Sequence, residues 1–283
     1  MDVGTLGLAF SVLPWKEGRK AEIWGQYCLE KVVSLSASES NDVKKISSDI
    51  QYLRKEADSL GACLVLPDEP NATIFQNGLP YPVALWVRGT LPPPTKCVAV
   101  VGSRATTEAG RRRAFIMGRE LTGAGIGVIS GLARGIDTAA HLGSLESGQT
   151  WGVLGSGLAN PYPFENISLM NRMVKSGGGV ITCFPPDAKP NKWHFPRRNL
   201  LMAAWTEGVV VIEAKLKSGS LITAKLALDL GKEVWAIPGT PEDQFSEGTN
   251  AMLREGSARL VRNAKDVLDD LEFDGAWRIG GRE

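Results

Sequence analysis

Residues 97–135 read CVAVVGSRATTEAGRRRAFIMGRELTGAGIGVISGLARG, and the rest of the chain is best understood from this stretch. It opens with an apolar, β-branched run at 97–101 without polar alternation, as is typical of a strand covered on both faces. A helix is predicted from about 108 to 122, ended by glycines. A second short apolar run follows at 126–129. The stretch therefore predicts a strand–helix–strand unit of an open α/β sheet.

Each of these two predicted strands ends in a glycine turn that carries an arginine. The first turn holds Gly102, Ser103 and Arg104, and the second holds Gly131 and Arg134. Ligands of open α/β sheets bind outside the carboxyl ends of the strands, so both turns should share one rim. Arginines at such turns indicate an anionic ligand, most simply a phosphate.

Regular alternation of apolar runs and helical patterns continues along the chain. Further strands are expected near residues 150–154, 179–182, 208–213, 233–237 and 259–261. Such alternation favours an α/β fold in which an extended Rossmann-like, doubly wound and mostly parallel sheet occupies residues 96–272.

Three segments flank this domain. Residues 1–66 are predicted to form a small, mainly helical module, with Ile50, Leu53 and Ala57 on one helix face. Residues 67–95 are rich in proline and read as a connecting segment with one short strand near 84–87. The polar end of the chain, residues 273–283, is expected to fray.

The composition excludes several classes of protein. The net charge is +1, so any nucleic-acid site must be a local patch. The four cysteines are widely scattered and show no CxxC spacing, which favours reduced thiols over disulfides or a metal site. No apolar run approaches the roughly 18 residues that span a membrane, and the first residues lack a cleavable signal. We therefore expect a cytoplasmic protein without a membrane span.

Two further turns offer small residues to the same rim. Gly155 and Gly157 follow one predicted strand, where they either let the backbone approach a ligand or simply make a tight turn. Ser218, Gly219 and Ser220 open a helix after another strand, and the free N–H groups there can hold a phosphate. Neither the GxGxxG of a dinucleotide fold nor the GxxxxGK[ST] of a P-loop occurs.

The segment 189–199, KPNKWHFPRRN, combines bases with aromatic rings and contains no acid. Its basic and aromatic residues, with the asparagine that ends it, are Lys189, Lys192, Trp193, His194, Phe195, Arg197, Arg198 and Asn199. Single-stranded nucleic acid needs charge for its phosphates and flat rings for its unstacked bases. A solvated loop with one or two anchoring aromatics is the alternative interpretation.

Asp137 and His141 stand four residues apart at the start of a predicted helix, so they lie on one face. A catalytic carboxylate–imidazole pair is one interpretation. A capping aspartate beside a structural histidine is the other, and it is favoured because no nucleophile is paired with them in the sequence.

Six motifs follow one another between residues 97 and 271. They are GSR at 102–104, SGLARGID with a histidine at 130–141, a GxGL turn with Tyr-Pro and Asn at 155–166, FPxRN at 195–199, SGSLITA at 218–224 and a proline–glycine turn at 237–239. Their order and spacing resemble the DNA-processing protein A family, also called Smf. The chain departs from that pattern at Leu200, where the family usually has an arginine, and at Cys183, where glutamate is common.

The resemblance implies an extended Rossmann-like domain that binds single-stranded DNA and delivers it to the recombinase RecA, usually during natural transformation. It also implies a homodimer formed through this domain, with no catalytic residue, metal or cofactor. The family's DNA pocket uses the arginine of GSR and a lysine and phenylalanine three residues apart, which are Arg104, Lys192 and Phe195 here. We expect the Phe195 ring to be exposed beside Lys192.

An alternative is a protein that binds or processes nucleotides on the same fold. A phosphoribohydrolase resembling the lysine-decarboxylase-like family needs a PGGxGTxxE turn, whereas residues 218–223 read SGSLIT, without that glutamate. A nucleotide-sensing defence module that uses the same pocket is a further hypothesis.

Overall fold

The computed structural model describes residues 50–67, 69, 79, 83–93 and 96–280. The strands are β1 Cys63–Val65, β2 Leu85–Gly89, β3 Cys97–Val101, β4 Gly127–Ser130, β5 Thr150–Val153, β6 Gly179–Thr182, β7 Gly208–Val211, β8 Glu233–Ala236 and β9 Arg259–Leu260. The helices are α5 Ile50–Ser59, α6 Glu108–Gly123, α7 Ile136–Ser144, the 3₁₀ turn η2 Phe164–Asn166, α8 Ile167–Lys175, α9 His194–Trp205, α10 Gly219–Asp229, α11 Glu247–Arg254 and α12 Ala264–Gly280.

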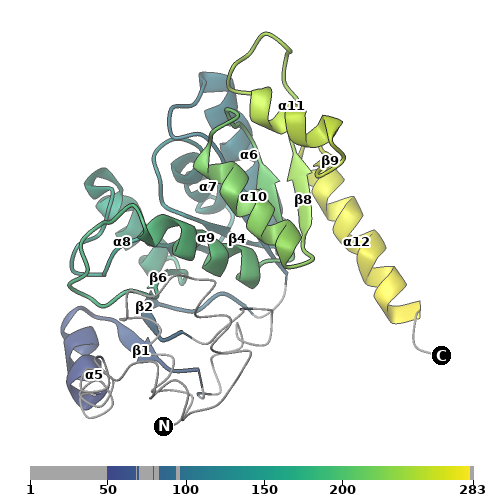
Figure 1. The fold of residues 1–283 in the computed structure, drawn as a ribbon. Coiled ribbons are helices and arrows are strands. Elements are labelled where there is room, and N and C mark those ends of the chain that lie inside the picture. Colours follow the sequence, from purple (N-terminus) through teal and green to yellow (C-terminus); the bar gives the residue numbers. More distant parts are fainter. Residues whose placement is uncertain (1–49, 68, 70–78, 80–82, 94–95, 281–283) are drawn as a thin grey trace, which may run out of the picture.

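One nine-stranded sheet organises these elements, in the order β1-β2-β6-β5-β4-β3-β7-β8-β9 (Figure 1). Every pair from β6 across to β9 is parallel, whereas β1 and β2 add to the β6 edge as antiparallel strands. From β3 the chain first winds to β4, β5 and β6 and later returns to β7 on the other side of β3. This is the doubly wound, mostly parallel sheet that the sequence predicts.

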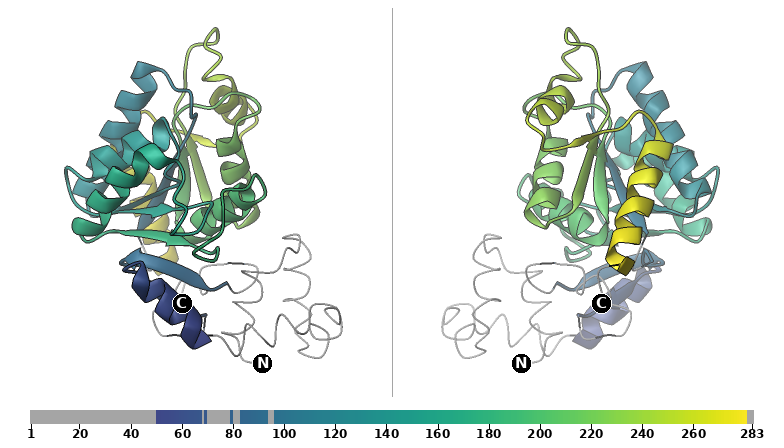
Figure 2. Two further views of the ribbon diagram at one scale, coloured as in Figure 1. Left: turned by 90° about the vertical axis from the view of Figure 1, so that its left-hand side faces the viewer. Right: turned by 90° about the vertical axis from the view of Figure 1, so that its right-hand side faces the viewer.

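The apolar run of β3 is buried along its whole length because helices cover both faces of the sheet. Cys97, Ala99 and Val101 belong to the core shared with α9 and α10, whereas Val98 and Val100 belong to the core shared with α6, α7 and α12. Alternate residues of a strand point to opposite faces, so one run serves both cores. Figure 2 shows the two helical layers on either side of the sheet.

The strands predicted between 96 and 272 are all present, and their ends agree within two residues. α5 also forms as expected, with buried Ala57 and the partly buried Ile50 and Leu53 in one cluster. The helices expected before residue 50 lie outside the described residues.

Two strands lie outside the predicted sheet domain and still belong to its sheet. β1 falls in the predicted helical module and β2 in the predicted connecting segment, yet β2 pairs with β6, with Trp86 opposite Thr182. This pairing joins residues about a hundred positions apart, so no local sequence pattern predicts it. The domain boundaries stay predictions, but the sheet crosses two of them.

The end of the chain also differs from the expectation. The backbone of α12 is helical to Gly280, whereas the sequence predicted a frayed tail from residue 273. A single glycine such as Gly275 costs a helix only about 1 kcal/mol relative to alanine, so it need not end one.

Candidate nucleic-acid interface

A cleft opens at the carboxyl ends of β3 and β7, where the strand order reverses and ligands of doubly wound sheets bind. It has a smaller chamber of about 220 Å³ and a larger one of about 570 Å³. The two chambers share the residues Arg104, Ala105, Ala133, Phe195 and Arg198. They are therefore two halves of one cleft.

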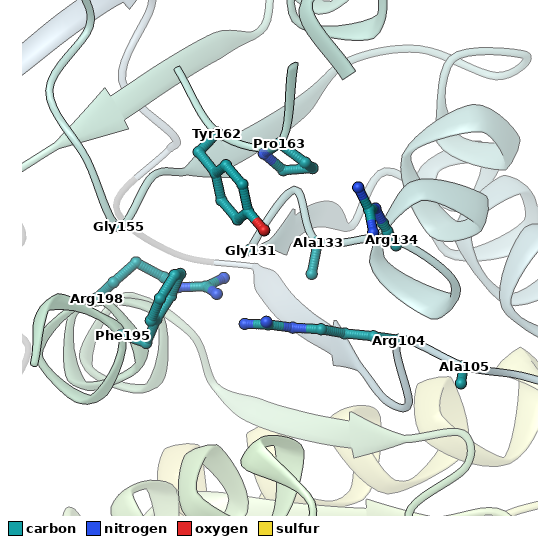
Figure 3. A pocket seen from close by; sticks show the side chains of 10 residues that line it. All are labelled: Arg104, Ala105, Gly131, Ala133, Arg134, Gly155, Tyr162, Pro163, Phe195 and Arg198. Carbon is teal, nitrogen blue, oxygen red and sulfur yellow. The ribbon is translucent and has the colours of Figure 1, made fainter. Parts of the chain in front are cut away.

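Two arginines and one phenyl ring form the centre of the cleft. The guanidinium carbon of Arg104 lies 5.0 Å from the ring centroid of Phe195, and that of Arg198 lies 5.9 Å from it. Figure 3 shows the guanidinium groups of Arg104 and Arg198 reaching toward each other beside this ring. Phe195 and Arg198 are one helical turn apart on α9, so a single helix face delivers both.

Arg198 is a buried cation. Its side chain is 5% exposed, and its Nη1 lies 3.8 Å from Oδ2 of Asp137. Burial lowers the pKa of Arg198 to about 10, the Asp137 carboxylate opposes this lowering, and the nearby Arg104 adds to it. The group therefore stays charged at neutral pH. A Cβ on Gly131 would lie 1.1 Å from Arg198 Nη1, so this glycine leaves the space that the guanidinium fills.

The carboxylate of Asp137 has a structural task. Its Oδ2 accepts the backbone N–H groups of Gly131 and Ala133, at 3.1 and 3.2 Å. Burial raises the pKa of Asp137, against the opposing effects of Arg198 and of these two N–H groups. His141 instead pairs through Nδ1 with the hydroxyl of Thr150 at 2.8 Å. These contacts favour the structural interpretation of Asp137 and His141.

A second carboxylate fixes the turn that carries Arg104. Glu213 follows β7, is buried, and accepts hydrogen bonds from the Thr106 hydroxyl and from the N–H and hydroxyl of Thr107. The Ser103 N–H in turn donates to the Glu213 carbonyl at 2.8 Å. The end of β7 therefore holds the turn after β3 in place.

The larger chamber is closed by the start of α10. The Ser218 hydroxyl caps this helix by accepting the N–H of Ser220 at 3.3 Å. Lys215 also lines the chamber, and its Nζ donates to Gln244 and lies 4.6 Å from the Phe245 ring centroid. A helix N-terminus beside lysines favours negative charge.

The segment 189–199 divides between surface, cleft and core. Trp193 is 73% exposed, and Lys192 Nζ lies 5.0 Å from its ring centroid. The Phe195 ring is half-buried, and the cation nearest to its centre is Arg104. The expectation of an exposed Phe195 ring beside Lys192 is therefore wrong: α9 begins at residue 194 and turns the ring into the cleft.

All but two of the predicted site residues line the cleft. Those in the smaller chamber are Arg104, Gly131, Arg134, Gly155, Phe195 and Arg198. Those in the larger chamber are Gly102, Ser103, Arg104, Lys192, Phe195, Arg198, Asn199, Ser218, Gly219 and Ser220.

The two exceptions, Gly157 and Arg197, face elsewhere. A Cβ on Gly157 would lie 2.1 Å from the carbonyl oxygen of Pro185, so this glycine serves close backbone packing. Arg197 is 6% exposed, with its guanidinium carbon 5.5 Å from the Phe184 ring centroid. One position along a helix rotates a side chain by about 100°, which takes Arg197 away from the face of Arg198. Neither lines either chamber.

Sequence reasoning missed two polar residues of the cleft. Tyr162 closes the smaller chamber, where Figure 3 shows its hydroxyl pointing inward, and Lys215 lines the larger one. Both stand in turns that follow strands, which was the available signal. Arg134 is held at the edge of the smaller chamber by an ion pair with Glu165.

Two kinds of feature are absent from the described ranges. None of the helices in that part of the chain combines the length and the apolar composition of a membrane span. No group of histidine, cysteine, aspartate or glutamate side chains there has the arrangement of a metal site. No disulfide joins any two of Cys63, Cys97 and Cys183, and burial raises the pKa of Cys97 to about 12; Cys28 lies outside the described residues.

The sequence matches the family model of DNA recombination-mediator protein A over residues 68–272. Protein Smf of Escherichia coli is 40% identical over 199 residues, which are 70% of this chain and 53% of that protein. DNA processing protein DprA of Bacillus subtilis is 37% identical over 193 residues, 67% of this chain and 64% of that protein. The chain thus spans between half and two-thirds of the length of these curated relatives.

Two solved structures share the fold. DNA processing protein A from Streptococcus pneumoniae superposes with a TM-score of 0.75 at 32% identity, covering 95% of this chain and 98% of that one. The Helicobacter pylori protein, whose structure concerns its mode of binding single-stranded DNA, gives a TM-score of 0.62 at 28% identity over 69% of this chain and 89% of that one. Since the family match covers well over half of its length, the chain belongs to the DNA recombination-mediator protein A family, also known as DprA/Smf.

Proposed function

We propose that the cleft binds the sugar–phosphate backbone of single-stranded DNA and that the protein acts as a recombination mediator rather than as an enzyme. The observation that carries this proposal is the guanidinium of Arg198. It is 5% exposed, borders both chambers, and its Nε has no hydrogen-bond partner among the described residues. A buried cation that keeps an unused donor is expected to receive an anion.

The charges around Arg198 support the same ligand. Arg104 lies against the same phenyl ring, and its charge disfavours that of Arg198. A phosphate placed between two guanidinium groups relieves such repulsion and accepts hydrogen bonds from both. Lys192 and the start of α10 extend the positive surface through the larger chamber. A chain of phosphates can occupy such a path, whereas one small anion would fill only part of it.

The roles of two buried carboxylates near the cleft support binding without catalysis. Asp137 and Glu213 are buried, and each accepts hydrogen bonds from neighbouring residues that it holds in place. A general base has to reach the proton that it removes. Asp137 borders only the larger chamber, where it already accepts two backbone N–H groups, and Glu213 lines neither chamber. The rim therefore offers cations and donors that suit binding.

Fluorescence anisotropy of labelled oligo-dT at several salt concentrations tests DNA binding. Affinity should fall steeply with salt, and Arg104→Ala and Lys192→Ala should each weaken binding and flatten the slope. Arg172→Ala is the matched control, because Arg172 is exposed near the end of α8, at the opposite rim. Salt-independent affinity, or an equal loss in the control, would overturn the electrostatic basis of the proposal.

The strand preference is a separate test. Rings contact bases only where the bases are unstacked, so a single strand should bind more tightly than a duplex of equal length. Equal affinities would mean that the cleft binds phosphates alone.

We also propose the partners that the family resemblance implies. We expect the protein to bind as a homodimer through the Rossmann-like domain and to speed the loading of RecA on single strands, as in natural transformation. Sedimentation checks the dimer. RecA filament formation on oligo-dT, with and without the protein, checks the mediator role; an unchanged rate removes that role while DNA binding stands.

A free nucleotide is the second candidate ligand, favoured by the size of the smaller chamber. Its volume of about 220 Å³ suits one nucleotide, and Tyr162 and Arg134 border it. Incubation with nucleoside monophosphates, scored for both binding and hydrolysis, separates this function from the first. Hydrolysis would identify an enzyme, whereas binding that oligo-dT displaces would mean that nucleotides and DNA share the chamber.

A further inference from the structure

Trp193 presents a large aromatic ring to solvent beside the cleft. Its side chain is 73% exposed, more than any other large hydrophobic residue in the described part of the chain. Lys192 Nζ lies 5.0 Å from the centroid of this ring, and Lys192 also lines the larger chamber. Trp193 itself lines neither chamber, but its ring lies against a lysine that lines the larger one.

The backbone that carries this ring is held firmly. The Trp193 N–H donates to Oδ1 of Asn191 at 3.1 Å. The next residue, His194, stacks on Phe184 with ring centroids 4.0 Å apart, and its Nδ1 lies 3.2 Å from the carbonyl oxygen of Gly155. A platform fixed in this way loses little conformational entropy when a ligand binds.

The ring of Phe195, by contrast, already contacts other groups of the protein. Its face carries the guanidinium of Arg104 at 5.0 Å, and Arg198 lies 5.9 Å from its centroid. On another side the backbone of Gly155 approaches so closely that a Cβ there would lie 2.9 Å from the ring. A base needs an open ring face for stacking. Lys192 Nζ lies over the Trp193 ring at 5.0 Å, but Trp193 is 73% exposed, so one face of the indole stays open, whereas the Phe195 ring is half-buried among its neighbours.

We propose that Trp193 is the base platform of this site, on which a nucleobase stacks where the strand leaves the cleft, and that Phe195 instead supports the two arginines that hold phosphate. This inference rests on the proposed binding of single-stranded DNA. Lys192 lies between the chamber and the indole, so it neutralises the phosphate that links the bound nucleotide to the stacked one. The strand then leaves across the start of α9.

The first test is a length series. Wild type and Trp193→Ala are compared by anisotropy on labelled oligo-dT of increasing length, with dTMP as competitor. Loss of a stacked base should weaken the longer oligonucleotides about five- to a hundredfold. The affinity for dTMP, which would fill only the smaller chamber, should not change. Trp193→Phe should keep most of the affinity because it still offers a ring.

Two controls separate the platform from a general effect. Tyr52→Ala removes another ring that is 65% exposed but lines neither chamber, so it should leave DNA affinity unchanged. Melting temperatures of the variants should equal that of the wild type, since an exposed ring contributes little to the core. A loss of dTMP affinity in Trp193→Ala would overturn the platform, because the indole would then act through the chamber itself.

The second test reads the indole directly. Stacking of a base quenches tryptophan fluorescence, and the chain has eight tryptophans. The quenching caused by saturating oligo-dT should therefore shrink in Trp193→Phe, and an abasic oligonucleotide should quench less than oligo-dT. If wild type binds oligo-dT and Trp193→Ala binds it equally well, the platform is refuted while the proposed function stands. If wild type binds no oligonucleotide, the proposed function itself fails.

Discussion

Replacing Asp137 by asparagine should destabilise the protein, because Arg198 would become a buried charge without a counterion. The two side chains are 5% and 6% exposed, and Arg198 Nη1 lies 3.8 Å from Asp137 Oδ2. Asparagine keeps the size of the side chain and an oxygen for the N–H groups of Gly131 and Ala133. The substitution therefore removes mainly the charge.

The distance sets the expected magnitude. Two unit charges 3.8 Å apart interact by about 4 kcal/mol at an effective dielectric constant of about 20. Removing one partner of a buried pair costs roughly 3–5 kcal/mol in comparable cases. We expect Asp137→Asn to lower the free energy of unfolding by about 3 kcal/mol. Without Asp137, burial and Arg104 should also lower the pKa of Arg198 further.

Urea unfolding at neutral pH, followed by circular dichroism, measures the effect in a double-mutant cycle. The cycle compares wild type, Asp137→Asn, Arg198→Met and the double variant. Because both single changes break the same pair, their losses should not add, and the double variant should be more stable than their sum predicts by about 2 kcal/mol or more. Losses that add within about 0.5 kcal/mol would refute the reasoning, since Asp137 and Arg198 would then act independently.

Three further outcomes are expected. Phe195→Ala should weaken oligo-dT binding about tenfold in anisotropy, because both arginines lose their support; unchanged affinity would contradict this role. Burial lowers the pKa of His141 to about 3, so between about pH 6.5 and 3 the unfolded chain binds more protons than the folded one. The free energy of unfolding should therefore decrease as the pH is lowered through this range, by up to about 1.4 kcal/mol per pH unit. His141→Gln should flatten that slope in urea unfolding. Gly131→Ala should weaken oligo-dT binding as much as Arg198→Met does, because the new methyl group takes the place of the guanidinium.

The sequence predicts the sheet well because its central strands are buried on both faces. The runs at 97–101 and 208–211 contain only apolar residues and glycine, and turns with small residues follow them, so strand, turn and rim could all be inferred locally. The antiparallel edge was not predicted. β1 and β2 are short, and their place depends on pairing with β6 far along the chain.

The site was predicted less completely, and the reason lies in how one helix is rotated. Arg197 and Arg198 are equivalent in a list of basic residues, but α9 turns one toward Phe184 and the other into the cleft. The start of α9 decides this, and the sequence analysis did not predict where that helix begins. Counting from a helix that begins at His194 would have put Phe195 and Arg198 on one face.

Two glycines at the rim of the cleft have a role that the sequence did not predict. The sequence favours glycine there for close approach of the backbone to a ligand. At Gly131, however, a Cβ would meet Arg198 at 1.1 Å, and at Gly155 it would meet Phe195 at 2.9 Å. These glycines make room for side chains, and the side chains present the charge and the ring to the cleft. A larger residue would therefore disturb binding through the position of Arg198 or Phe195, even without touching the ligand.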